Sequence, residues 1–251
     1  RVGGLTWRQY LFTRRFETEA KQMKKSLKGE IPRQAVYRLS VYMRCLMRLK
    51  ANGIETVSSQ ALSGAAGVKP TQLRKDLTYF GQFGTRGLGY DVHQLTDMIT
   101  EVLGTSTLQP VVLVGVGNLG KALISYRGFE REGFEIVSAF DADSALTQGP
   151  LRQGIPVRPM EQLREVVEEH QVKMAVLCVP AEAAQSTANL LMQAGVTGIL
   201  NFAPMVLHAP EGVTVNNVNL AIELENLSYF IQDHASELED ASPIQEEPAS
   251  S

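Results

Sequence analysis

The stretch VVLVGVGNLGKAL, residues 111–123, limits the possible fold more than any other part of the chain. Residues 111–114 are apolar and mostly β-branched, which is typical of a parallel strand with helices on both faces of its sheet. Gly115, Gly117 and Gly120 follow as G-x-G-x-x-G. Such glycines allow a tight turn, a close approach of backbone to a pyrophosphate, and close packing of the next helix. The pattern predicts a dinucleotide-binding loop, with phosphates on free N–H groups at a helix N-terminus.

A second strand and an acidic residue follow this loop. Residues 134–140 are predicted to form the strand, and Asp141 ends it, about 20 residues beyond the last glycine, as a ribose-binding carboxylate does. An acid at this place favours NAD over NADP. The alternative is a glycine-rich turn in another kind of α/β protein. We expect the cofactor to contact Gly115, Val116, Gly117, Asn118, Leu119, Gly120 and Asp141.

Charge is divided unevenly between the two ends of the chain. The formal net charge is −3, but residues 1–80 hold 16 Lys and Arg against 5 Asp and Glu, whereas residues 81–251 hold 8 against 22. A basic N-terminal part on an acidic body indicates nucleic-acid binding, because Lys and Arg that face phosphates release condensed counterions. A solvated basic surface is the alternative.

The basic part has the helix order of a helix-turn-helix domain. An amphipathic helix is predicted over residues 32–50, with an apolar stripe made of Val36, Leu39, Met43, Leu46 and Leu49. A short helix over residues 59–65 would be capped by Ser58 or Ser59. After a glycine turn, Pro70 suits the first position of a third helix.

The third helix has an apolar and a polar face. Leu73, Leu77 and Phe80 lie on the apolar face. A recognition helix presents such a polar face to the major groove, where Arg and Gln can read base edges. A plain three-helix packing domain is the alternative. The predicted DNA-binding residues of this segment are Lys69, Thr71, Gln72, Arg74, Lys75, Thr78 and Tyr79.

Residues 83–90, FGTRGLGY, alternate glycine with aromatic and basic residues. This is typical of a short β-hairpin wing whose backbone comes close to DNA. Arg86 at its tip could enter a minor groove, and we expect Gly87 and Tyr90 to contact DNA as well. An interdomain hinge is the alternative, and the two roles are compatible.

Composition places the chain among soluble cytoplasmic proteins. It is long enough for two domains, and no apolar stretch approaches the roughly 18 residues of a membrane span. Cys45 and Cys178 lie in apolar patterns, so we expect neither a disulfide framework nor a zinc site. The four histidines are scattered without a second ligand at i+3 or i+4, and no metal is predicted.

Further strands are predicted at residues 174–179 and 198–202, with a helix over residues 181–194 between them. Pro180 and Asn201 lie at strand ends, where ligands bind in parallel sheets, and are predicted cofactor contacts. A linker helix is expected over residues 92–103. Near the C-terminus an apolar stripe could dock on a partner subunit or cover its own domain; it contains Leu220, Leu224, Leu227 and Ile231.

Three stretches together resemble the Rex family of bacterial redox-sensing transcriptional repressors: VSSQALSGAAGVKPTQLRKDLTYFGQFGTRGLGYDV, VGVGNLGKAL and VPAEAAQSTANLLMQAGVTGILNFAP. The resemblance implies a winged-helix domain, a Rossmann domain that senses the NADH to NAD ratio, and a homodimer that exchanges C-terminal helices. It implies repression of fermentation and respiration genes, with NADH releasing the dimer from palindromic operators. It places the helix-turn-helix at about residues 39–78 and a tyrosine near the nicotinamide at Tyr126.

The chain departs from the family at one place. Family members carry an aspartate at the start of the C-terminal helix, where it can engage an arginine of the first DNA-binding helix. Here the motif is VNNVNLAIEL, so Asn219 takes that place, and Arg44 resembles the arginine. An asparagine brings no charge, and charged hydrogen bonds contribute more than neutral ones. We therefore expect weaker coupling between cofactor and DNA than an ion pair would give.

The predicted fold class is α/β, with an N-terminal winged-helix domain, a Rossmann doubly wound parallel sheet and a domain-swapped C-terminal helix. The expected function is that of a repressor released from operator DNA by NADH, and not an enzyme. The alternatives are a dehydrogenase or CoA-ligase-like enzyme, or a DNA-binding protein with a structural nucleotide. The expected segments are a basic extension or misplaced start (1–30), the winged helix (31–90), a linker helix (91–107), the Rossmann domain (108–216), a dimerisation helix (217–236) and a disordered acidic tail (237–251).

Overall fold

The computed structural model describes residues 31–85, 87–143 and 154–240, with side chains in the last range up to residue 232. It divides into two compact units, Arg1–Leu108 and Gln109–Ser251. The basic extension expected at residues 1–30 lies outside the described residues, and so does Arg86. Each unit is a folded body with its own core.

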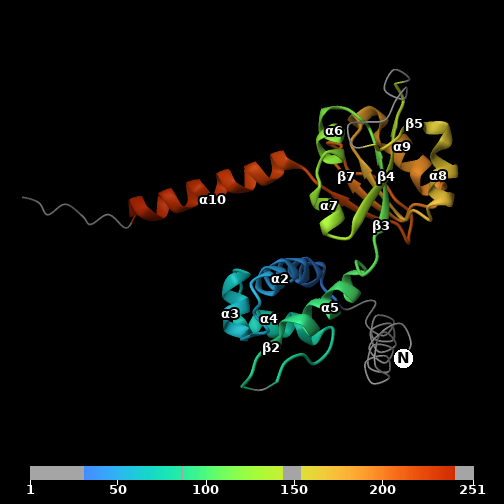
Figure 1. The fold of residues 1–251 in the computed structure, drawn as a ribbon. Helices are drawn as coiled ribbons and strands as arrows, with labels where there is room; N and C mark the ends of the chain where they lie inside the picture. Colours follow the sequence, from blue (N-terminus) through green and yellow to red (C-terminus); the bar gives the residue numbers. More distant parts are fainter. Residues whose placement is uncertain (1–30, 86, 144–153, 241–251) are drawn as a thin grey trace, which may run out of the picture. The chain divides into compact units, whose positions relative to one another are not determined.

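Unit 1 contains four helices and a small antiparallel sheet among its described residues (Figure 1). The strands pair Thr56 with Asp91 and Val57 with Tyr90. This is the helix order of a winged helix, as predicted. The strand at residues 56–57 was not predicted, and within the hairpin predicted for residues 83–90 the structure has an isolated antiparallel bridge between Thr85 and Gly89. The elements are α2 (Arg33–Ala51), β1 (Thr56–Val57), α3 (Ser59–Ala65), α4 (Pro70–Thr78), β2 (Tyr90–Asp91) and α5 (Val92–Leu103).

Local chemistry sets the helix boundaries in unit 1. The Ser58 side chain accepts a hydrogen bond of 3.0 Å from the Ala61 N–H, which caps α3 as one of the two predicted serines. Pro70 begins α4, where its missing N–H costs nothing. Asp91 caps α5 by accepting from the Gln94 N–H at 2.8 Å.

The core of unit 1 corrects two expectations. Val36 was expected on the apolar stripe of α2 but is 40% exposed, whereas Tyr42 is fully buried there. The residues expected to form a linker helix form α5. This helix is part of the domain, because Leu95 and Ile99 pack in the same core as residues of α2 and α4. The buried residues that α2, α4 and α5 contribute are Ala35, Leu39, Tyr42, Leu46, Leu73, Asp76, Leu77, Val92, Leu95, Thr96 and Ile99.

The described residues of unit 2 form a six-stranded, wholly parallel sheet in the order β5-β4-β3-β6-β7-β8. Counted along the chain this is 3-2-1-4-5-6, the order of the Rossmann fold, so the predicted fold class of this unit is confirmed. The chain reverses its direction of winding between β3 and β6, where such folds bind ligands. The strands are β3 (Gln109–Val114), β4 (Phe134–Asp141), β5 (Val157–Pro159), β6 (Met174–Leu177), β7 (Gly198–Asn201) and β8 (Thr214–Asn217).

Helices cover both faces of this sheet (Figure 1). Alternate residues of β3 explain the two cores: Val112 packs with the helices on one face, and Leu113 with α6 on the other. The sequence did not predict α7, α8, β5 or β8, which are short. The helices are α6 (Asn118–Ile124), α7 (Gly128–Arg131), α8 (Leu163–Glu169), preceded by a 3-10 turn (Met160–Gln162), and α9 (Ala181–Gln193).

The C-terminal helix α10 (Leu220–Asp240) buries none of its described side chains. It begins after β8 and continues four residues into the tail that was expected to be disordered; residues 241–251 lie outside the described part of the chain. Seven of its apolar side chains are at least half exposed: Leu220, Ile222, Leu224, Leu227, Tyr229, Phe230 and Ile231. Within the described residues, no helix combines the length and apolar character that a membrane crossing requires.

Candidate DNA and dinucleotide sites

The glycine loop lies between the carboxyl end of β3 and the start of α6. Gly115 has a φ of 97°, and a Cβ there would overlap the carbonyl oxygen of Cys178. A Cβ at Gly120 would overlap the carbonyl oxygen of Gly115, whereas one at Gly117 would meet nothing within 4 Å. The first and third glycines are therefore required by packing, and the middle one leaves an open approach. This arrangement fits a bound pyrophosphate, as the sequence predicted.

Asp141 lies at the end of β4, directly beside this loop. Its Oδ2 atom accepts a hydrogen bond of 2.7 Å from the Val116 N–H, and its Oδ1 atom accepts one of 2.9 Å from the Asp143 N–H. The Val116 side chain is fully buried. The carboxylate thus fixes the loop from the side where the ribose would bind. The N–H of Val116 is engaged by Asp141, so it is not among the free donors expected for phosphate.

The two other strand-end residues have different environments. Pro180 is exposed and precedes α9 at the end of β6. Asn201 is fully buried, and its Nδ2 atom donates to the Met205 carbonyl and to Asn217 Oδ1, both at 2.9 Å. Its Oδ1 atom accepts from the Ala203 N–H at 3.0 Å. The polar side-chain atoms of Asn201 are therefore engaged by β8 and by the segment that follows β7, and a contact between Asn201 and the cofactor stays a prediction.

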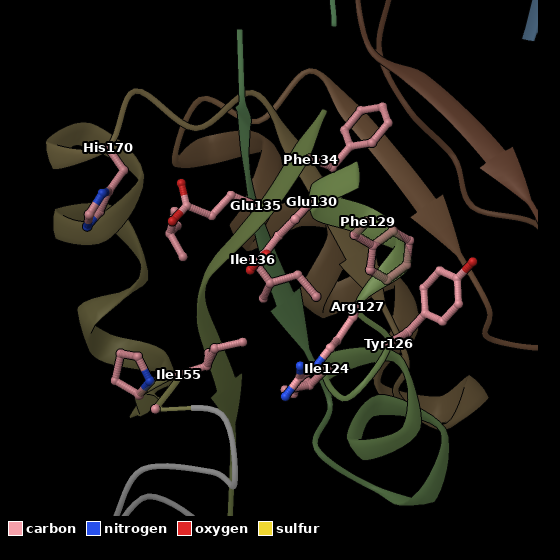
Figure 2. Close-up of a pocket in the computed structure, with 13 residues that line it drawn as sticks. Ile124, Tyr126, Arg127, Phe129, Glu130, Phe134, Glu135, Ile136, Ile155 and His170 are labelled. Atoms are coloured by element: carbon pink, nitrogen blue, oxygen red, sulfur yellow. The ribbon is translucent and has the colours of Figure 1, made fainter. Parts of the chain in front are cut away.

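Tyr126 lies beyond α6, at the opposite end of that helix from the glycine loop. It borders a cavity of about 590 Å³ next to the N-terminal half of β4. Figure 2 shows the Tyr126 ring beside that of Phe129, with its hydroxyl pointing away from the other labelled side chains. The two rings meet edge to face, with centroids 5.1 Å apart. Tyr126 does not join the cluster of Gly115, Gly120 and Asp141, and its role near a nicotinamide stays a prediction.

The polar face of α4 lies on the surface of unit 1. Five predicted DNA contacts, Lys69, Thr71, Arg74, Lys75 and Thr78, are exposed, while Gln72 and Tyr79 are half-buried. The Arg74 Nη1 atom donates to Ser59 Oγ on α3 at 3.3 Å. The helix therefore presents two basic and two hydroxyl side chains on one side and packs with the other.

A buried ionic network under this surface was missed by the sequence analysis. Asp76 of α4 is completely buried. Arg38 donates to it from Nε at 2.6 Å and from Nη2 at 2.8 Å, Tyr42 donates its hydroxyl at 2.7 Å, and Gln72 donates from Nε2 at 2.7 Å. One signal was available: Asp76 is an acid on the apolar side of a basic helix.

The hydrogen bonds of this network determine its charge. Burial alone raises the pKa of Asp76, but hydrogen bonds from Arg38, Tyr42 and Gln72 outweigh it, and the net pKa is lowered. Burial raises the pKa of Tyr42, and its hydrogen bond to the carboxylate adds to the effect. The network therefore holds an ionised Asp76 against a charged Arg38 and a neutral Tyr42.

One residue of the wing differs from its predicted environment. Tyr90 was expected to contact DNA, but it is only 6% exposed and packs in the core of unit 1, and burial raises its pKa. Gly87 is exposed, as a DNA-contacting wing requires. A Cβ at Gly89 would overlap the carbonyl oxygen of Val57, so this glycine is required by strand pairing.

Arg44 and Asn219, the expected coupling pair, lie in different units. Arg44 is exposed on α2, and its Nη1 atom donates to the Ser40 carbonyl at 3.1 Å. Asn219 precedes α10, and its Oδ1 atom accepts from the Ala221 N–H at 3.0 Å. The asparagine thus caps α10, a task that an aspartate performs equally well. Among the described residues, no group of three or more His, Cys, Asp or Glu could hold a metal ion.

Comparisons with known proteins cover both units. Residues 30–78 match the family model "Putative DNA-binding protein N-terminus", and residues 106–205 match "CoA binding domain". The Redox-sensing transcriptional repressor Rex of Streptomyces coelicolor is 46% identical over 207 residues, which are 82% of this chain and 80% of that protein.

Two solved structures of RSP, a Rex-family repressor, have the same fold. Its complex with beta-NAD+ and operator DNA matches with a TM-score of 0.76 and 32% identity, over 85% of this chain and 99% of the other. Its complex with beta-NADH matches with a TM-score of 0.74 and 31% identity, over 84% and 98%. By its sequence and by the fold of both units, the chain belongs to the Rex family of redox-sensing transcriptional repressors.

Proposed function

We propose that this chain represses transcription by binding palindromic operator DNA as a homodimer, and that NADH in its Rossmann unit releases it. The observation that carries the proposal is the combination, in one chain, of an exposed basic recognition helix and a glycine loop with Asp141 at its edge. RSP has been solved both with beta-NAD+ and operator DNA and with beta-NADH. Relatives such as the Streptomyces coelicolor protein are named repressors, which weighs against the enzyme alternative.

On the DNA side, α4 is the recognition helix. Lys69, Arg74 and Lys75 would contact phosphates and base edges from its exposed face, with Thr71 and Thr78 between them. Lys and Arg at such positions make affinity strongly dependent on salt. The exposed Gly87 lets the wing backbone approach the duplex, and Arg86 is proposed for the wing tip.

On the cofactor side, the loop residues would hold the pyrophosphate and Asp141 would accept hydrogen bonds from the adenosine ribose. The open space at Gly117 and the start of α6 at Asn118 and Leu119 support this placement. The hydrogen bond from Val116 keeps Asp141 ready at the edge of the loop. A nicotinamide dinucleotide supplies the redox signal, because its reduced and oxidised forms differ in charge and shape at the nicotinamide ring.

The exposed apolar surface of α10 supports a homodimer. Leu224, Leu227 and Ile231 are each more than half exposed, and their spacing of three and four places them on one side of the helix. So much apolar surface on one helix is typical of a protein interface. We propose that a second copy of the chain covers α10, and that the protein acts in the cytoplasm, where it meets both operator DNA and NADH.

Control by NADH requires two dimer geometries. In one, the two recognition helices would meet successive major grooves, roughly 34 Å apart. Binding of the reduced cofactor must favour the other, and a ligand shifts such an equilibrium only by its differential affinity. Moving an operator from mostly occupied to mostly empty requires about 3 to 5 kcal/mol of preference. Asn219 would accept a hydrogen bond from the charged Arg44 in this coupling, without the second charge that makes an ion pair.

The test is a titration of the protein–operator complex with NADH and, separately, with NAD+. We expect NADH to release the duplex at concentrations at which NAD+ leaves it bound, as followed by fluorescence anisotropy of labelled DNA. Equal effects of the two forms would contradict redox sensing. No effect of either, with both bound, would identify the nucleotide as a structural ligand.

A further inference from the structure

The buried carboxylate of Asp76 fixes one side chain at the DNA-facing start of α4. Gln72 Nε2 lies 2.7 Å from Asp76 Oδ1, one helical turn away. An ionised carboxylate only accepts hydrogen bonds, so the atom of Gln72 that faces it must be the amide nitrogen. The amide oxygen is then turned away from Asp76. The orientation of this amide, which is normally ambiguous, is determined by chemistry.

The carboxylate is itself immobile, because three further hydrogen bonds reach it from α2. Arg38 donates twice and Tyr42 once, at 2.6 to 2.8 Å. Tyr42 lies in the centre of the core of unit 1 with Leu39 and Leu46. The Gln72 amide is thus tied through Asp76 to the core of the domain. Arg74, by comparison, makes a longer hydrogen bond of 3.3 Å, to the Ser59 hydroxyl at the domain surface.

We propose that Asp76 is a positioning residue for base recognition, and that the Gln72 amide it holds reads an adenine in the major groove. The inference rests on the proposed function as an operator-binding repressor. Gln72 lies in the first turn of α4, and the N-terminal residues of a recognition helix contact base edges. Asp76 engages one of the two N–H groups of the Gln72 amide. The Oε1 atom and the second N–H of that amide remain available. These two match the N6 donor and N7 acceptor of adenine.

The test compares base preferences. A random duplex library first defines the palindrome that the unmodified chain selects, and single base-pair changes through one half-site then give a panel of duplexes. We expect that replacement of one particular A·T pair weakens binding about tenfold, because Gln72 then loses its contact with the adenine. In Gln72→Met, which keeps the length of the side chain but lacks the amide, that preference is lost and preferences at other positions persist.

Asp76→Asn tests the positioning role. An asparagine can donate as well as accept, so it no longer imposes one orientation on the Gln72 amide. We expect the same A·T preference to weaken, with the other positions unchanged. Tyr42→Phe is the matched control: it removes a hydrogen bond to the other carboxylate oxygen, so it lowers stability and leaves the base preference intact. A purely structural role for Asp76 predicts equal effects of both variants on every position.

The outcomes are distinguishable. If Asp76→Asn does not fold, the double variant Arg38→Met/Asp76→Asn removes the charge together with its partner, and the same loss of preference is expected from it. An unaltered base profile in Gln72→Met, or in a folded Asp76 variant, overturns the inference while the repressor function stands. If the unmodified chain selects no duplex at all, the proposed function fails, and the inference fails with it.

Discussion

The two binding surfaces are built on opposite principles. In unit 1 the recognition helix is held from below by a buried ion pair with two further hydrogen bonds, so charged side chains determine the geometry of the surface. In unit 2 the dinucleotide loop is shaped by glycines that pack against backbone carbonyl groups, and a single carboxylate fixes its edge. The side-chain network is therefore sensitive to charge and pH, whereas the glycine loop is sensitive to volume.

The largest effect is expected from Asp76→Ala. Removing the carboxylate leaves Arg38, whose side chain is 23% exposed, without its buried partner. Breaking a buried pair costs about 3–5 kcal/mol, and because Arg38 is partly exposed we expect a cost at the lower end, about 3 kcal/mol. Chemical denaturation of the variant should therefore show a much lower free energy of unfolding for unit 1, and a cost below about 1 kcal/mol would contradict our account of the network.

Gly120→Ala tests whether the dinucleotide loop is sensitive to added volume. Its new Cβ would overlap the Gly115 carbonyl oxygen, so the loop must move. We expect NADH binding, followed by cofactor fluorescence, to weaken about 100-fold, which corresponds to about 2.7 kcal/mol. DNA binding without cofactor should persist. Gly104→Ala, in the turn that follows α5, is a control for a glycine substitution away from the loop and should leave NADH affinity unchanged.

Acid should affect unit 1 less than removal of Asp76 does, because protonation leaves the oxygen atoms in place. The pKa of Asp76 is lowered in the folded chain, so its contribution to stability is complete above the ordinary value of 3.8 and is lost as the pH falls through the folded value. Denaturation curves between neutral and acid pH should show a loss that is reduced in Asp76→Asn. An identical pH dependence in this variant would count against the network as its source.

The smallest effect is expected from Ser58→Ala, which removes the cap of α3. Loss of an N-cap costs about 1 kcal/mol. A melting curve should show a modest decrease in stability, with NADH affinity unchanged because the cap lies in unit 1. Ser59→Ala is the control, since Ser59 was the other predicted cap and does not accept the Ala61 N–H.

Short-range patterns predicted most of the fold. The bounds of α3, the start of α4 and the end of β4 agree with the sequence analysis, because caps, prolines and glycines act within a few residues. Periodicity was less reliable for α2, where Val36 is exposed. Buried Tyr42 was not predicted, because its hydroxyl is satisfied by Asp76, which lies 34 positions along the chain.

Two of the predicted site residues illustrate one physical limit of local patterns. Asn201 and Tyr90 are polar or amphipathic residues next to binding segments, and the sequence analysis therefore assigned them to ligands. Both are buried, and the hydrogen bonds of Asn201 are made to residues of its own unit. Whether a polar side chain faces a ligand or the core depends on how the surrounding chain packs, and its local pattern is the same in both cases.

The sequence by itself determined the two binding units, the glycine loop with Asp141, and the exposed face of the recognition helix, because each depends on residues a few positions apart. Only the tertiary structure decided which polar groups are buried together. Arg38, Tyr42, Gln72 and Asp76 come from two helices that folding brings into contact, and desolvation makes their hydrogen bonds obligatory. A buried charge needs a partner, and three-dimensional packing alone identifies it.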